Sequence, residues 1–157
     1  MTMLLRISRA GKAVLASLIL SVAGSSGALA ASSAGTIKVL TGSATVTRDS
    51  SILAATIGQR LFPGDRISTS SASYVGVVLR DDTRISIGPH AEFSIVEFDF
   101  DSSSYAGGLV VSFLKGTARV LTGIVGRHAP DRVRFRTATT TIGIRGTDFI
   151  VDLENRQ

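Results

Sequence analysis

Cysteine and tryptophan are absent from this chain of 157 residues, and proline, methionine, histidine and tyrosine are scarce. Without cysteine there can be no disulfide framework, no thiolate metal site and no cysteine nucleophile. Stability must therefore come from apolar burial and from backbone hydrogen bonds. Hydrophobic residues make up 44% of the chain and charged residues 18%. That balance predicts a folded globular protein and not a disordered one.

Sequence motifs of catalysis are missing as well. The chain has no G-x-S-x-G, no H-E-x-x-H, no phosphate loop and no dinucleotide fingerprint. The two histidines, His90 and His128, each lie close to a proline, where we expect exposed loop residues and not catalytic bases. Asp99 and Asp101 resemble the start of a calcium loop, but the twelfth position, Val110, offers no carboxylate. The sequence therefore predicts no enzyme, no cofactor and no metal site.

The N-terminus has the pattern of a secretory signal. A positive region precedes an apolar run at residues 13–23, and Ala28-Leu29-Ala30 follows as a small-x-small cleavage site. The positive region contains Arg6, Arg9 and Lys12. We therefore expect residues 1–30 to be a helical signal peptide that directs export, with no stable membrane span after its removal. An uncleaved anchor is the alternative, but the apolar run is about half the length that a membrane span requires.

The charge of the chain depends on this leader. The full sequence has 17 basic and 12 acidic side chains and a net charge of +5. Three basic residues belong to the leader, so the exported part keeps 14 basic and 12 acidic side chains, a net charge of +2. Such a weakly basic domain gives no reason to expect nucleic-acid binding.

Beyond the leader, apolar and polar residues alternate with a period of two, which is typical of half-buried β-strands. Glycine and aspartate turns separate these runs, so the sequence predicts an all-β domain of antiparallel hairpins, stacked as a sandwich or a short β-solenoid. We expect a flexible segment at 31–35, the domain at 36–153 and a tail at 154–157. Only 50–61 leaves room for a short helix or a bent strand. The alternation places these residues in the core: Val75, Val77, Leu79, Ile85, Ile87, Phe93, Ile95, Val111, Phe113, Val120, Phe135, Ile142, Ile144, Phe149 and Val151.

Four segments of the domain carry turn motifs in a fixed order. They are IGQRLFPGDRIST at 57–69, RDDTRISIGP at 80–89, FLKGTAR at 113–119 and TATTTIGIRGTDF at 137–149. They resemble, in that order, the G-x-x-L-x-x-G-D-x-I-x-T, D-G-T-x-I-x-L-x-P, L-x-x-G-x-x-R and T-P-x-A-x-x-x-V-R-G-T-x-F patterns of the FecR domain family. The resemblance departs from the family pattern at two positions, where Asp82 stands for glycine and Ala138 for proline. At Asp82 we expect a different turn or some backbone strain.

The resemblance implies a stand-alone, non-enzymatic periplasmic domain that binds a partner or relays a signal in the cell envelope. The signalling protein that names the family has a cytoplasmic anti-sigma segment and a membrane helix, and here the leader takes their place. The alternative function is a carbohydrate- or peptidoglycan-binding β module, although the chain has no tryptophan and only two tyrosines for an aromatic platform. A long free sheet edge would offer strand addition as a docking mode.

Residues of the family motifs also have a simple role in folding. Pro63 and Gly64 suit a tight turn, and the side chain of Asp65 can bond to nearby backbone amides. Glycine between Arg145 and Thr147 would allow a sharp bend. We therefore interpret the motif residues as structural turn residues: Gly64, Asp65, Arg145, Gly146 and Thr147.

Two stripes of charge suggest a more specific site. Arg132, Arg134 and Arg136 alternate with apolar residues, as do Glu97, Asp99 and Asp101, so each set should leave one face of a strand. Three interpretations stay open: plain solvated faces, cross-strand ion pairs that fix the register, or docking of a partner on the arginines. In the third, Arg127, Arg132, Arg134 and Arg136 bind an unknown protein or an anionic envelope partner.

Overall fold

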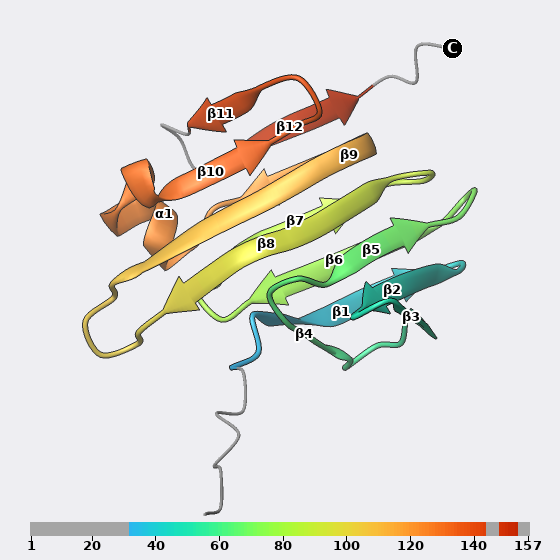
Figure 1. Ribbon diagram of the computed structural model, residues 1–157, viewed down its shortest axis with the longest axis horizontal. Coiled ribbons are helices and arrows are strands. Elements are labelled where there is room, and N and C mark those ends of the chain that lie inside the picture. The colour runs from blue at the N-terminus through green and yellow to red at the C-terminus, as the bar shows by residue number, and fades with distance from the viewer. Residues whose placement is uncertain (1–31, 144–147, 154–157) are drawn as a thin grey trace, which may run out of the picture. The chain divides into compact units, whose positions relative to one another are not determined.

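The computed structural model describes residues 32–143 and 148–153 (Figure 1). The predicted signal peptide at 1–30, the predicted tail at 154–157, Ile144 and the turn residues Arg145, Gly146 and Thr147 lie outside this description. Within the described residues, no helix has both the length and the apolar character needed to cross a membrane.

Nearly all regular structure in the described part of the chain is β-strand, which confirms the predicted fold class. The strands form one hydrogen-bonded network in the order β3-β2-β5-β8-β9-β7-β6-β1-β4, with β10 and β12 added beside β9 and β11 beside β10. Their bounds are β1 (Gly35–Thr41), β2 (Ala44–Arg48), β3 (Ser51–Ala54), β4 (Arg60–Leu61), β5 (Arg66–Thr69), β6 (Tyr74–Leu79), β7 (Arg84–Ile87), β8 (Glu92–Phe100), β9 (Gly107–Leu121), β10 (Val133–Arg136), β11 (Thr141–Gly143) and β12 (Asp148–Leu153).

The network curls into two arms that share β9 (Figure 1). The first half of β9 pairs with β8 and β10, and the second half pairs with β7 and β12. The partner strands of β9 change at Gly116, whose φ of 80° is unfavourable for other residues. A Cβ there would lie 2.6 Å from the Cα of Ala91, so glycine also permits a close approach of two chain segments. We call β3, β2, β5, β8, the first half of β9, β10 and β11 the β8 arm, and the remaining strands the β7 arm.

The loops that carry the chain between the arms stack on one another. The Ser43 amide, after β1, donates to the Ser73 hydroxyl, before β6, at 3.0 Å. The Thr69 hydroxyl, at the end of β5, donates to the carbonyl of Gly88, after β7, at 2.7 Å. Two facing arms with stacked crossing loops thus combine features of both predicted arrangements, the sandwich and the short solenoid.

A single apolar core fills the space between the arms. Of the predicted core residues, Phe149 is partly buried, Ile142 is 39% exposed and the rest of the described ones are buried. The prediction for Ile142 is wrong because β11 is a short edge strand, bonded only to β10, with no layer covering it. Phe135 on β10 meets Phe149 on β12 edge-to-face at 4.7 Å, so an aromatic contact also joins the two arms.

Within residues 32–143 and 148–153, helix occurs only in the connection between β9 and β10. Segment 50–61, where a short helix or a bent strand was expected, forms the short strands β3 and β4. Instead, α1 (Ile124–His128) and the 3-10 turn η1 (Pro130–Arg132) lead the chain to β10, which runs parallel to the first half of β9. The Ile124 amide donates to the Asp81 carbonyl at 2.7 Å, which anchors the start of this connection.

Candidate functional site

A groove crosses the outer face of the β8 arm, and the pairing of three strands sets its geometry. β9 bonds to β8 on one side and to β10 on the other. The register places Glu97, Val110 and Arg134 in one row, and Asp99 beside Gly108 in the next. Adjacent strands lie about 4.8 Å apart. The acidic strand β8 and the arginine-bearing strand β10 are therefore separated by about 10 Å.

A β-bulge turns the acidic side chains toward this face. The pairing of β8 with β9 shifts between Ile95 and Glu97, so Val96 is an extra residue in β8. After the bulge Phe98 is buried, whereas Glu97 and Asp99 are exposed on the outer face. A signal for this was present in the sequence, because the alternating phenylalanines and isoleucines change from odd to even positions at this point.

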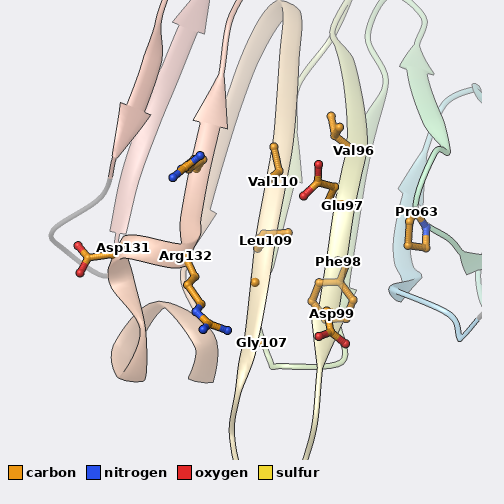
Figure 2. Close-up of a pocket in the computed structure, with 12 residues that line it drawn as sticks. Pro63, Val96, Glu97, Phe98, Asp99, Gly107, Leu109, Val110, Asp131 and Arg132 are labelled. Atoms are coloured by element: carbon orange, nitrogen blue, oxygen red, sulfur yellow. The ribbon is translucent and has the colours of Figure 1, made fainter.

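The groove has a volume of about 530 Å³ and a floor of short side chains (Figure 2). Val110 lies level with Glu97 and Arg134 and is only 7% exposed. Gly108 beside it adds no side chain. Twelve residues line the groove: Pro63, Val96, Glu97, Phe98, Asp99, Gly107, Gly108, Leu109, Val110, Asp131, Arg132 and Arg134.

The charged side chains on the two walls have no partner of opposite charge among the described residues. The ion pairs found there are Arg48–Asp65, Arg66–Glu92 and Arg119–Asp148. The hypothesis that the arginine and acidic stripes pair directly is wrong, because β9 lies between their strands. Figure 2 shows the acidic groups on β8 and Arg132 on the other side of β9.

The four arginines predicted as a docking stripe are all exposed, but they do not form one row. Arg132 ends η1, just before β10, and Arg134 follows on β10; both line the groove. Arg136 lies further along β10, level with Ser112. Arg127 lies in the last turn of α1. The groove thus brings together two of the predicted arginines and two members of the acidic stripe. The floor of the groove was not predicted from the sequence.

Gly64 and Asp65 form a turn that is fixed by a buried carboxylate. Gly64 has a φ of 93°, and Asp65 is fully buried. Asp65 accepts two hydrogen bonds of 2.7 Å from Arg48, on β2, and one of 2.8 Å from the amide of Phe62. The carboxylate raises the pKa of Arg48. The Arg48 guanidinium also lies 4.5 Å from the centre of the Phe62 ring. These contacts give both residues a structural role in the turn before β5.

A second buried aspartate organises the turn between β6 and β7. Asp81 accepts hydrogen bonds from the amide of Thr83 at 3.1 Å and from its hydroxyl at 2.8 Å. That hydroxyl in turn accepts a hydrogen bond from the amide of Gly123 at 2.9 Å. Asp82 has a φ of 64°. It therefore adopts the left-handed conformation that suits the glycine of the family pattern, at some cost in conformational energy.

The two histidines and the acidic residues do not assemble a metal centre within the described residues. His90 and His128 are both exposed. His128 stacks on Tyr105 with ring centres 5.4 Å apart. Asp101, in the loop after β8, accepts hydrogen bonds from the amides of Ser103 and Ser104, which lower its pKa.

A known sequence family matches the larger part of the chain. The sequence model of the FecR protein family matches residues 65–157, which is more than half of the chain and runs from β5 through β12. The chain belongs to the FecR family. The matched FecR region contains every residue that lines the groove except Pro63. A solved structure titled "Cell surface anchoring domain" is 26% identical over 39% of this chain and 82% of that chain, with a TM-score of 0.37. No curated protein matches the chain.

Proposed function

We propose that this FecR-family chain is a non-enzymatic binding or signal-relay module of the cell envelope. In this proposal it is exported to the periplasm and holds a protein or an envelope ligand by non-covalent contact in the groove over β8, β9 and β10. Family membership supports an envelope-associated signalling or binding role. The described motif residues Gly64, Asp65, Asp81 and Asp82 lie in turns, whereas the groove carries charged side chains that these turns do not use.

The observation that carries the proposal is that charged side chains at the groove have no ion-pair partner among the described residues. Elsewhere on the surface, Arg66 pairs with Glu92 and Arg119 with Asp148, at 2.7 and 2.6 Å, while others such as Arg84 have no ion pair among the described residues. The groove differs because unpaired charges of both signs line one trough. At the groove, side chains of both signs face an open trough without a partner among the described residues. Unpaired charges beside a groove whose floor consists of short side chains can contact another molecule. Such charge contacts favour fast and selective association.

A substitution that fills the groove tests the proposal without altering the charge of the groove. A Cβ at Gly108 would lie no closer than 3.6 Å to any neighbour, so Gly108→Gln places a neutral side chain on the groove floor with no backbone clash. The matched control is Gly143→Gln on β11, where a Cβ meets nothing within 4 Å. The readout is capture of partners from an envelope extract by immobilised protein recovered after expression of the full chain.

We expect Gly108→Gln to lose capture of any partner that Gly143→Gln and the unmodified protein retain, with unchanged thermal unfolding in both variants. Capture by Gly108→Gln equal to that of the unmodified protein would overturn the proposal.

A glycan-binding function is the second candidate, and one observation favours it. Tyr105 is 48% exposed and stacks with His128, which makes a small aromatic platform in the loop that leads to Gly107. Aromatic faces of this kind can contact sugar rings. Loss of binding to peptidoglycan fragments in Tyr105→Ala, with retention in Gly108→Gln, would favour this candidate over the groove.

A further inference from the structure

The layout of charge in the groove restricts what kind of partner fits it, and this inference rests on the proposed function. Glu97 and Asp99 form one wall, and Arg132 and Arg134 form the other. Asp131 is the remaining charged lining residue, and in Figure 2 it projects away from β9, on the far side of Arg132. The groove is therefore dipolar and has no excess of positive charge.

A partner of uniform charge is poorly matched to such a groove. An anionic group at Arg134 would lie within about 10 Å of Glu97, because a single strand separates the two residues in their row. This separation is close to the Debye length of about 8 Å at physiological ionic strength, so repulsion by the opposite wall is only partly screened. The anionic partner expected from the arginine stripe alone is therefore replaced by one that carries both signs.

We propose that the groove binds an extended peptide segment with a cationic and an anionic side chain two residues apart, so that both leave the same face of the segment. An extended chain advances about 3.3 Å per residue, so these side chains start about 7 Å apart, and their length covers the rest of the roughly 10 Å between the walls. The low floor of Gly108 and Val110 leaves room for the segment to cross β9. Its ammonium or guanidinium group pairs with Glu97 and Asp99, and its carboxylate pairs with the arginines, which suit bidentate contact.

Three blocked peptides of equal length test this assignment against the full protein. They are the dipolar Gly-Lys-Gly-Glu-Gly-Gly, the dianionic Gly-Glu-Gly-Glu-Gly-Gly and the dicationic Gly-Lys-Gly-Lys-Gly-Gly. Binding is followed by the amide shifts of Gly108 and Val110 in NMR titrations at low salt. We expect the dipolar peptide to bind about tenfold more tightly than either of the others.

Variants that neutralise one wall of the groove should shift the peptide preference in opposite directions. The double variant Glu97→Gln with Asp99→Asn should gain affinity for the dianionic peptide, and Arg132→Gln with Arg134→Gln should gain affinity for the dicationic one. The matched controls are Arg84→Gln on β7 and Asp49→Asn in the turn after β2, both exposed and away from the groove lining. These controls should keep the preference for the dipolar peptide.

Equal binding of all three peptides, or binding of none, would overturn the assignment. So would equally tight binding of a free zwitterionic amino acid, because it cannot span the walls. The proposed function would survive any of these results if Gly108→Gln still lost capture from the envelope extract. It would fail separately if capture did not depend on the groove.

Discussion

The Arg48 guanidinium holds the buried carboxylate of Asp65 through two parallel hydrogen bonds, from Nε to Oδ1 and from Nη2 to Oδ2, each 2.7 Å long. This bidentate pair joins β2 to the turn that precedes β5. Asp65 is fully buried, whereas the side chain of Arg48 is 32% exposed. The geometry explains the Gly-Asp motif of the chain as a folding element, because the aspartate satisfies donors from two separate segments.

Replacement of Asp65 should therefore be costly. Asp65→Ala removes the acceptor for three hydrogen bonds and leaves Arg48 unpaired at a partly buried position. We expect the free energy of unfolding to fall by about 3 kcal/mol. Urea denaturation followed by circular dichroism measures it. Arg66→Gln is the control: it breaks an exposed pair with Glu92 and should cost less than about 1 kcal/mol. Equal losses in the two variants would contradict the structural role of Asp65.

The turn at Asp82 should gain stability from glycine. Asp82 has a φ of 64°, a conformation that glycine adopts without steric cost. We expect Asp82→Gly to raise the free energy of unfolding by about 0.5–1 kcal/mol. The converse change, Gly64→Ala at a φ of 93°, should lower it, and no neighbour lies within 4 Å of the added Cβ, so the effect is that of the backbone alone. Stabilisation by both substitutions would contradict this account of the turns.

Asp148 should titrate below an ordinary aspartate, because hydrogen bonds from Arg119 lower its pKa. A depressed pKa in the folded state stabilises the protein above the unfolded pKa of about 3.9, and that contribution is lost as the pH falls through the folded value. In Arg119→Gln we expect the pKa of Asp148 to rise and the acid dependence of stability to weaken. Carboxyl NMR titration measures this.

Asp101 is the internal control for that titration. Backbone amides of Ser103 and Ser104 lower its pKa, so Arg119→Gln should leave it unchanged. A shift of both carboxyl groups would indicate a general change of fold, and no shift of Asp148 would contradict the pairing.

Gly123 and Gly108 should respond differently to alanine. A Cβ at Gly123 would overlap the Asp81 carbonyl and the Thr83 amide, whereas one at Gly108 makes ordinary contacts. We expect Gly123→Ala to cost about 3 kcal/mol of unfolding free energy, and Gly108→Ala to cost less than about 1 kcal/mol. Thermal unfolding of the two variants measures the difference. Tolerance of alanine at Gly123 would show that α1 does not dock against the turn between β6 and β7.

The sequence predicted the strands well because alternation reports directly which residues share a face. Val75, Ile85 and Phe93 are buried as expected. The same pattern failed at Ile142, because alternation defines a face but does not show whether another layer covers it. The change of partner strands along β9 could not be predicted either, since it accompanies the close approach of Gly116 to Ala91, which lie far apart in the sequence.

The groove was only partly predictable for a related reason. The outward direction of Arg134 and Glu97 followed from alternation. Their placement on opposite sides of β9 depends on the parallel pairing of β9 with β10, which the sequence does not specify. The Gly107-Gly108 pair at the start of β9 was the available sign of a low floor, but only the neighbouring walls make it a groove.

Photo-cross-linking from the groove rim tests the central claim most directly. The chain has no cysteine, so Asp131→Cys can carry a single short photoreactive maleimide at the rim without filling the floor, with Arg84→Cys on the β7 arm as control. We predict a discrete adduct with an envelope component from position 131, absent from position 84 and suppressed by excess unmodified protein but not by Gly108→Gln. Adducts of equal yield from both positions, or from position 84 alone, would contradict the assignment of the groove as the binding surface.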